Sequence, residues 1–214
     1  MTGQFVSRAS TSVDFDQVLS RRRMVRNYLP DHVPPEVLVR IAEAGRKAPS
    51  AGFSQGTAFV IVTDHGQRQL VAQLAGEDSY VASGFDPWIS GAPAHIIVCV
   101  SEDAYHRRYR ESDKLDPDGQ EREWPIPFWW VDAGAALMLV LLAAVNEGLA
   151  AGFLGVHSIP GLQNLLAIPD EYLPIGVVTV GYGAPDRRSG SLRRGWRPDP
   201  SVIHWNRWTE MSGN

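Results

Sequence analysis

The stretch WWVDAGAALMLVLLAAVNEGLAAGFLGV, residues 129–156, sets the architecture that the rest of the chain has to accommodate. Between Asp132 and Asn146 no side chain is polar. This run is shorter than the roughly 20 residues that a membrane-spanning helix needs, and a helix that is apolar on every side has to be buried. We therefore predict a buried helix, then a glycine turn and a short strand, with a second subunit as a source of cover.

On either side of this stretch, helical and strand-like patterns alternate. A helix is predicted over PPEVLVRIAEAGRKA, residues 34–48, because proline suits a first helical turn and apolar residues recur at helical spacing. Apolar, β-branched runs predict strands over AFVIVT, AHIIVCV and IGVVTVGY, residues 58–63, 94–100 and 175–182. Strands interspersed with helices indicate an α+β sandwich in which helices pack against one sheet.

No internal repeat and no linker-like change of composition divides the chain, so we predict one domain over residues 1–214. Residues 1–14 are expected to form an N-terminal arm, and residues 184–214, rich in Arg, Pro and Trp, a C-terminal extension. Residues 101–130 are charged and irregular, and a segment of that length in a compact domain is usually a functional lid or disordered.

The composition limits the classes of function. A net charge of −4 and a pI near 5.8 argue against a nucleic-acid-binding protein, which would carry a basic face. The one cysteine, Cys99, lies in an apolar run and is interpreted as a buried hydrophobe, and the N-terminus has no apolar core of a secretory signal. We therefore predict a cytoplasmic protein that binds neither nucleic acid nor a membrane.

Two arginine clusters stand out in this acidic chain: RRRMVR, residues 21–26, and the segment 187–197, which contains five arginines. The planar fork of arginine donates two parallel hydrogen bonds to a phosphate or a carboxylate. A solvated basic face is the alternative for either cluster alone. Two clusters together favour a bound phosphate or carboxylate.

The loop APSAGFSQ, residues 48–55, combines small side chains with free backbone amides. A planar ring could approach it closely, and Gln55 offers both a donor and an acceptor to a polar ring edge. An ordinary loop that ends a helix fits the same residues. The sequence has no Walker loop, strand-linked GxGxxG, HExxH pair or GxSxG frame, so a phosphate-loop nucleotide site, a metal site and a serine hydrolase are not expected.

Taken in order, three segments resemble the FMN-dependent nitroreductase superfamily, from about Asp16 to Trp208. RRRMVRNY and the helix that ends in APS are similar to the family's N-terminal signature, and residues 129–156 to its central helix and glycine turn. IPDEYLPIGVVTVGYGAPD, residues 168–186, is similar to its last strand before a basic tail. The resemblance implies an α+β three-layer sandwich, with a central mixed, mainly antiparallel sheet flanked by helices, in an intertwined homodimer.

The same resemblance implies two non-covalent FMN sites at the subunit interface, each built from both chains. The arginines would hold the phosphate and ribityl chain, the loop would line the ring of the partner chain's site, and the end of the short strand would present backbone amides to the flavin. No catalytic acid or base is implied. The implied cofactor-binding residues are Arg22, Arg23, Met24, Arg26, Pro49, Ser50, Ala51, Phe53, Gln55, Leu154, Gly155, Arg194 and Arg197.

The implied reaction passes a hydride from NAD(P)H through FMN to a planar acceptor such as a nitroaromatic or a quinone. Met24 and Phe53 depart from residues frequent in the family. Two alternatives therefore stay open: a specialised member of the fold (dehydrogenase, dehalogenase or flavin-fragmenting dimethylbenzimidazole synthase) and a protein that sequesters flavin without turnover. The lid would hold aromatic side chains that stack on the acceptor or pack at the dimer interface, namely Trp124, Phe128, Trp129 and Trp130.

Overall fold

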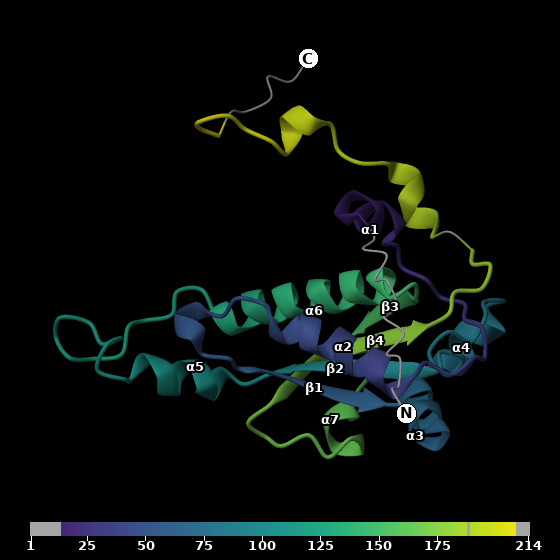
Figure 1. Cartoon of the computed structure of the whole chain (residues 1–214), viewed down its shortest axis with the longest axis horizontal. Helices are drawn as coiled ribbons and strands as arrows, with labels where there is room; N and C mark the ends of the chain where they lie inside the picture. The colour runs from purple at the N-terminus through teal and green to yellow at the C-terminus, as the bar shows by residue number, and fades with distance from the viewer. Residues whose placement is uncertain (1–13, 188, 209–214) are drawn as a thin grey trace, which may run out of the picture.

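The computed structural model describes residues 14–187 and 189–208. Its centre is a four-stranded sheet in the order β1-β2-β4-β3 (Figure 1). Every neighbouring pair of strands is antiparallel, and β1 and β3 are the two edges. The predicted strand regions are confirmed, with the bounds Thr57–Val62 for β1, Ala94–Val100 for β2, Ala150–Gly155 for β3 and Leu173–Gly181 for β4.

One further segment lies along the edge of β3. Met24 forms a parallel bridge with Ala151, and the amide of Val25 donates to the carbonyl of Ala151 at 3.0 Å. Tyr28 forms an antiparallel bridge with Gly183, just beyond β4. The first arginine cluster is therefore docked on the edge of the sheet. This bridge lies outside the four strands, so the sheet itself is antiparallel, and only the predicted antiparallel character is confirmed.

Helices cover both faces of the sheet and complete the three layers (Figure 1). α2 and α6 pack on one face, and α3 and α7 pack on the other, with α4 beside α3. The predicted α+β sandwich is thus confirmed. The bounds are Pro35–Arg46 for α2, His65–Leu74 for α3, Glu77–Ala82 for α4, Phe128–Asn146 for α6 and Leu162–Leu165 for α7.

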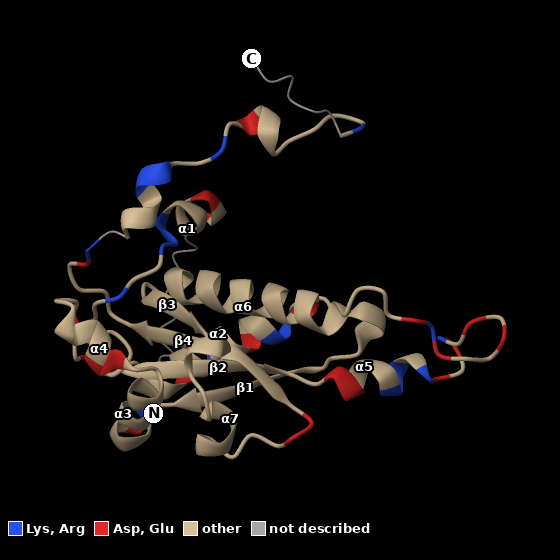
Figure 2. Ribbon diagram, turned by 180° about the vertical axis from the view of Figure 1, so that it is seen from behind, with Lys and Arg blue, Asp and Glu red and all other residues tan. Residues whose placement is uncertain are grey.

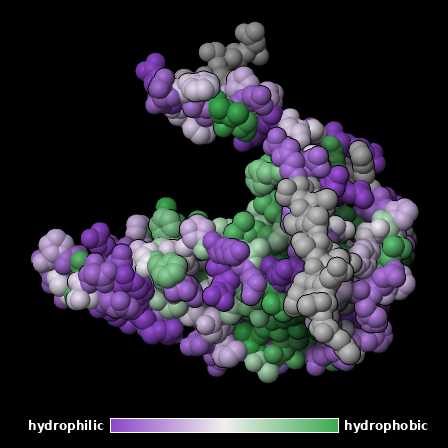
Figure 3. Space-filling model, in the orientation of Figure 1, coloured by the Kyte–Doolittle hydropathy of each residue, from purple (hydrophilic) through white to green (hydrophobic). Residues whose placement is uncertain are grey.

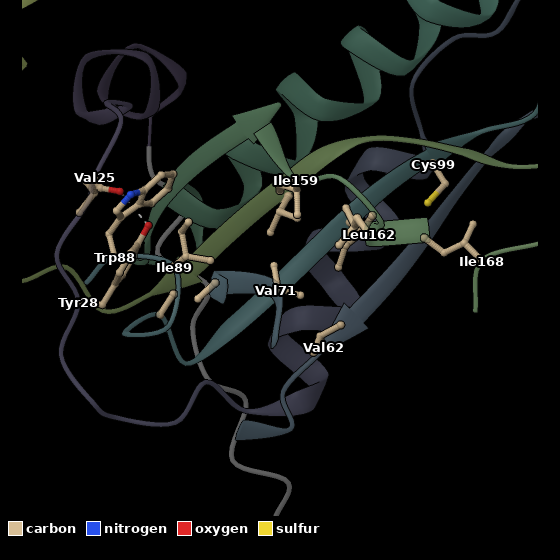
Figure 4. Close-up of a cluster of buried hydrophobic side chains, with 14 residues drawn as sticks. Val25, Tyr28, Val62, Val71, Trp88, Ile89, Cys99, Ile159, Leu162 and Ile168 are labelled. Carbon is tan, nitrogen blue, oxygen red and sulfur yellow. Dashed lines mark hydrogen bonds between the residues drawn. The ribbon is translucent and has the colours of Figure 1, made fainter. Parts of the chain in front are cut away.

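Two buried clusters fill the spaces between these layers. Because alternate residues of a strand point to opposite faces, Ile96 and Val98 of β2 pack with α2 and α6, whereas Ile97 packs with α3 and α7. Figure 4 shows the latter cluster, where Val71 of α3 and Leu162 of α7 lie over the sheet. Both faces of β2 are covered, which explains why its sequence is a continuous apolar run.

The contact between α2 and α6 depends on a glycine. A Cβ atom at Gly45 would lie 2.7 Å from Cγ2 of Val140 and 2.8 Å from Cζ of Phe59. The backbone of α2 therefore lies closer to α6 and β1 than any side chain at this position would allow. This close packing holds the end of α2, and with it the loop that follows, against α6.

Helix α6 begins at Phe128 rather than at the predicted Asp132. Its inner face is buried on the sheet, but on its outer face Val131 is 53 % and Met138 45 % exposed. By length and composition alone α6 could cross a membrane, a test that core helices of globular proteins also pass. The described residues therefore leave part of this outer face uncovered, and the expected cover by a second subunit remains a prediction.

The segment 101–130 is more regular than predicted, because helix α5 (Glu102–Tyr109) occupies its first part. The side chain of Ser101 caps this helix by accepting a hydrogen bond from the amide of Ala104. Tyr105 is fully buried and joins a third cluster with Trp129 and neighbouring side chains. The expectation of an irregular segment is therefore wrong for residues 102–109, since a cap and a buried tyrosine stabilise a helix there.

The C-terminal extension stands clear of the three layers (Figures 1 and 3). It contains two short 3-10 helices, η3 (Gly190–Arg194) and η4 (Asp199–Ser201). Its large side chains are exposed, Trp196 to 96 % and Trp205 to 83 %. At the other end of the chain, α1 (Phe15–Arg21) is the first helix, and residues 1–13 of the predicted N-terminal arm lie outside the described residues.

Candidate functional site

The first arginine cluster leaves α1 in an extended conformation. Arg22 ends the helix with φ −62° and ψ 115°, and the chain then runs to the Met24 bridge on β3. From the other side, the carboxylate of Asp186 accepts a hydrogen bond from the amide of Arg26 at 3.0 Å. This bond ties the start of the C-terminal extension to the N-terminal arginine segment, so the two clusters, far apart in sequence, start from neighbouring backbone.

A cavity of about 490 Å³ lies between the two clusters, and we call it the arginine cavity. Arg26 lies over the ring of Trp88 at 5.5 Å, and Arg187 lies over the ring of Phe85 at 5.2 Å. Figure 2 shows the basic residues of the extension near α1. The cavity is lined by Arg26, Tyr80, Phe85, Arg187, Ser189, Gly190 and Arg193.

The arginine cavity is suited to an anion. Among residues 14–187 and 189–208, none of Arg26, Arg187 and Arg193 forms an ion pair with a carboxylate. Their guanidinium groups therefore keep donors for a ligand, and a phosphate or carboxylate is the ligand that such forks bind most strongly.

The other predicted arginines take different places. Arg22 is half-buried, and Arg23 lines a separate hollow of about 190 Å³. Arg194 ends η3 and Arg197 follows it, both exposed, whereas their neighbour Arg193 lines the arginine cavity. The sequence offered no signal to choose among adjacent arginines, because the turn of η3 decides which one faces the cavity.

The second part of the candidate site is the outer edge of β3. Leu154 and Gly155 pair with Val177 and Gly176 of β4. On the other side of β3 the described residues place no further strand, and the Met24 bridge occupies the edge only at Ala151. Alternate backbone amides of such an edge strand face away from the sheet and remain available to a ligand. From the Met24 bridge to Gly155 the strand advances by about 13 Å.

The third part is the loop 49–55, which follows α2. Its backbone is strained: φ is +58° at Phe53 and +52° at Gln55, a region that residues other than glycine rarely adopt. The hydroxyl of Ser50 accepts a hydrogen bond from the amide of Gln55 at 3.0 Å. Pro49 and Gln55 are exposed and Phe53 is 75 % exposed, so the loop presents an accessible surface with a fixed shape.

The loop 49–55 and the arginine cavity lie at opposite ends of the sheet. The loop leads into the first residue of β1, Thr57, which pairs with the last residue of β2, Val100. Val100 in turn pairs with the first residue of β4, Leu173, so the loop lies at this end of the sheet. The arginine segment docks where β3 begins, beside the end of β4 at Gly181. A strand of 9 residues separates these ends, about 30 Å. One chain therefore does not bring its own loop 49–55 to its arginine cavity.

The segment 101–130 encloses a cavity of about 400 Å³ beside the loop, which we call the lid cavity. Of the predicted lid aromatics, Trp124 and Phe128 line it, Trp129 is buried in the third core cluster, and Trp130 lines a different hollow. Trp124 meets Tyr109 edge-on, with ring centroids 4.4 Å apart. The lid cavity is lined by Ala51, Tyr109, Arg122, Glu123, Trp124, Pro125, Ile126 and Phe128.

A network of charged side chains holds the later part of the segment 101–130, around Glu121, against α5. Glu121 is hydrogen-bonded to His106 and accepts hydrogen bonds from Arg110 at 2.8 Å and from Trp124 at 3.0 Å. The hydrogen bond with Glu121 raises the pKa of His106 above its ordinary value. Burial raises the pKa of Glu121, but the hydrogen bonds from His106, Trp124 and Arg110 outweigh it, so this pKa is lowered. Both shifts favour the charged pair.

The model of the Nitroreductase family matches residues 19–182 of this sequence. The chain belongs to this family. The matched range covers the first arginine cluster, the loop 49–55, the segment 101–130 and the edge strand β3, and the whole C-terminal extension follows it. By its family the protein is an oxidoreductase.

The similarity of this nitroreductase family member to known proteins covers most of its length. The FMN reductase [NAD(P)H] of Bacillus subtilis is 27 % identical over 198 residues, covering 87 % of this chain and 71 % of the relative. Iodotyrosine deiodinase 1 of Mus musculus is 30 % identical over 203 residues, covering 86 % of this chain and 67 % of the relative. The structure of an NADPH:FMN oxidoreductase from Vibrio harveyi complexed with NAD+ shares the fold, with a TM-score of 0.68 at 21 % identity over 92 % of this chain and 79 % of that one.

Two buried side chains of this family member, Cys99 and His95, stay uncharged at neutral pH. Burial raises the pKa of the Cys99 thiol to about 12, which leaves it protonated and unreactive. Burial lowers the pKa of His95 to about 4, so its ring is neutral. Within the described part of the chain, no group of three or more His, Cys, Asp or Glu side chains could hold a metal ion.

Proposed function

We propose that this protein is an FMN-dependent oxidoreductase that transfers a hydride from NAD(P)H to a planar organic acceptor. The observation that carries the proposal is the arginine cavity, where Arg26, Arg187 and Arg193 converge without carboxylate partners in the described chain. A phosphate monoester matches these donors. The FMN reductase [NAD(P)H] and the NADPH-flavin oxidoreductase among its relatives support this choice of phosphate ligand and electron donor.

The residues present fit FMN. The arginine cavity would take the phosphate, and the free edge of β3 would offer backbone amides to the polar rim of the ring. When bound, FMN supplies the hydride acceptance and donation, while the protein orients its partners and excludes water. From one chain, Arg26, Arg187 and Arg193 would hold the phosphate, and Leu154 and Gly155 would face the ring. The family resemblance also assigns to this site residues that lie outside the arginine cavity, and these stay proposals: Arg22, Arg23, Met24, Arg194 and Arg197.

The same proposal requires a homodimer. Because the loop 49–55 lies at the far end of the sheet from the arginine cavity, a second copy would supply its loop to complete each site. The exposed outer face of α6 and the exposed tryptophans of the C-terminal extension are the surfaces that a partner copy would cover. The residues contributed by the second copy would be Pro49, Ser50, Ala51, Phe53 and Gln55.

The acceptor would bind in the lid cavity, against Trp124 and Phe128. Nitroaromatics and quinones are planar and stack on such side chains. Reductive dehalogenation is the second candidate, because iodotyrosine deiodinase 1 is among the relatives that cover most of this chain. A cytoplasmic location and the absence of nucleic-acid and membrane partners remain predictions from the sequence.

Purified protein tests the proposal directly. We expect a yellow protein whose flavin absorbance bleaches under anaerobic NADH or NADPH and returns when a nitroaromatic, a quinone or an iodinated tyrosine is added. The acceptor that restores absorbance fastest distinguishes reduction from dehalogenation. A colourless protein that does not bind added FMN ends the proposal, and FMN binding without nicotinamide oxidation assigns a sequestering role instead.

A further inference from the structure

A buried carboxylate on α6 holds the loop 49–55 in place. Asp132 is 8 % exposed, and its Oδ2 accepts a hydrogen bond from the amide of Ala51 at 2.8 Å. The same oxygen accepts a second hydrogen bond from the hydroxyl of Tyr105 at 2.9 Å. One carboxylate oxygen therefore joins three elements that are distant in sequence: the loop, the lid helix α5 and the first turns of α6.

This carboxylate has no cationic partner within residues 14–187 and 189–208. A buried charge is costly unless it is well hydrogen-bonded, so the bonds from Ala51 and Tyr105 are what the fold provides to stabilise it. A purely apolar residue could fill the same volume without this cost. The presence of a carboxylate at this position thus indicates a role for its hydrogen bonds or its charge at the loop.

Two more contacts from α5 act on the same loop. The guanidinium Nε of Arg108 donates to the carbonyl of Gly52 at 2.9 Å. Gly52 has φ +61°, and a Cβ there would lie 2.7 Å from the ring of Tyr109. The lid helix therefore packs directly on the loop backbone, and Tyr109 is also a wall of the lid cavity. A change in the lid would be transmitted to the loop through these contacts.

We infer that Asp132 is a positioning residue for the flavin: it sets where the loop 49–55 lies against the ring bound by the partner chain and, through Tyr105, couples that position to the lid helix. This inference rests on the proposed function. The acceptor cavity and the cofactor would then share one structural element, and the negative charge of Asp132 would oppose negative charge on the reduced flavin.

Three variants separate these effects. Asp132→Ala removes both hydrogen bonds and the charge, and we expect FMN affinity to fall roughly tenfold or more, as loss of a charge-assisted bond predicts. Asp132→Asn keeps an acceptor oxygen, so affinity stays within about threefold while the flavin reduction potential becomes more positive. Tyr105→Phe keeps the bond to Ala51, so FMN affinity is nearly unchanged while the KM for the acceptor rises and kcat is retained.

A matched control is Val71→Ala, which removes buried side-chain volume on the opposite face of the sheet. It lowers the free energy of unfolding but leaves FMN affinity and reduction potential at wild-type values. If Asp132→Ala behaves like this control, the inference is overturned while the proposed function stands. If Asp132→Ala does not fold, an unchanged potential in Asp132→Asn and an unchanged acceptor KM in Tyr105→Phe overturn it. Wild-type protein that binds no FMN overturns both proposals.

Discussion

Arginines at the two ends of the sheet differ in what they contact. At the lid end, Arg107 and Arg110 are ion-paired with Glu171 and Glu121 at 3.9 and 2.8 Å. At the other end, Arg26 and Arg187 lie over aromatic rings, and within the described residues neither guanidinium forms an ion pair with a carboxylate. A clustered cation without a protein counterion marks where an external anion belongs, whereas paired arginines stabilise the segment that carries them.

The largest effect is expected from the C-terminal extension, which contributes two of the three cavity arginines, Arg187 and Arg193. Deletion of residues 195–214 keeps Arg187 and Arg193 but removes Trp196 and Trp205, together with Arg197. If these tryptophans anchor a partner copy, the truncated protein is monomeric and its FMN affinity falls more than about 100-fold, because each site loses the partner's loop. Sedimentation velocity and flavin fluorescence measure the two losses. A truncated dimer that still binds FMN contradicts the two-chain site.

Arg26→Ala tests the unpaired end itself. Hydrogen bonds to a charged group contribute about 1.5–3 kcal/mol, so FMN affinity is expected to fall roughly 10- to 100-fold. The control is Arg107→Ala at the lid end, whose side chain is 60 % exposed, and which should change affinity less than about twofold. Titration of apoprotein with FMN gives both values. If the two substitutions lower FMN affinity equally, the proposed difference between the unpaired and the ion-paired arginines is wrong.

Gly152→Ala tests how the unpaired arginines are held against β3. A Cβ at Gly152 would lie 2.6 Å from the carbonyl oxygen of Val25 and 2.9 Å from Trp88. The arginine segment would have to move, and overpacking of this kind costs about 1–3 kcal/mol of unfolding free energy. Denaturant unfolding measures it. In the control Gly66→Ala, the added Cβ would meet only the carboxylate of Asp64, at 3.3 Å. A stability loss equal to that of Gly152→Ala would contradict the close docking.

The smallest effect concerns pH at the paired end. The pKa of His106 is raised from 6.5, so its contribution to lid stability is complete below about pH 6.5 and is lost as pH rises through the raised pKa. The pKa of Glu121 is lowered from 4.5, so its contribution is present above about pH 4.5 and is lost as pH falls through the lowered pKa. Amide exchange around Trp124 should therefore be slowest between these limits and quicken less than about fivefold at higher pH, after correction for intrinsic exchange. His106→Gln should remove the rise, and a rise that persists in this variant contradicts the assignment.

The sequence predicted the layers of the fold well, because they depend on local patterns. The apolar run of residues 94–100 predicted a strand, and β2 occupies these residues and is buried at every position. Helix α5 was missed, although Ser101 followed by Glu102 and Asp103 is an N-terminal helix signal. This helix was missed because many of its residues are charged and Tyr105 is its one buried residue, so no apolar helical spacing marks it in the sequence.

The candidate site was predictable in kind but not in detail. Arginine clusters and a small-residue loop indicate an anion and a planar ring whatever the fold. That Arg193 rather than Arg194 lines the cavity follows from the turn of η3. Nothing local marks Asp132 as the acceptor for Ala51, because the two residues meet only when α6 and α2 pack on the same face of the sheet.

By itself, the sequence determined an α+β fold around an apolar helix and the chemical types available to bind a ligand, since periodicity and side-chain chemistry are properties of short segments. Only the tertiary structure decided that the unpaired arginines and the loop 49–55 occupy opposite ends of β4. The pairing register of the strands makes that decision, and register is set by contacts between residues far apart in the chain.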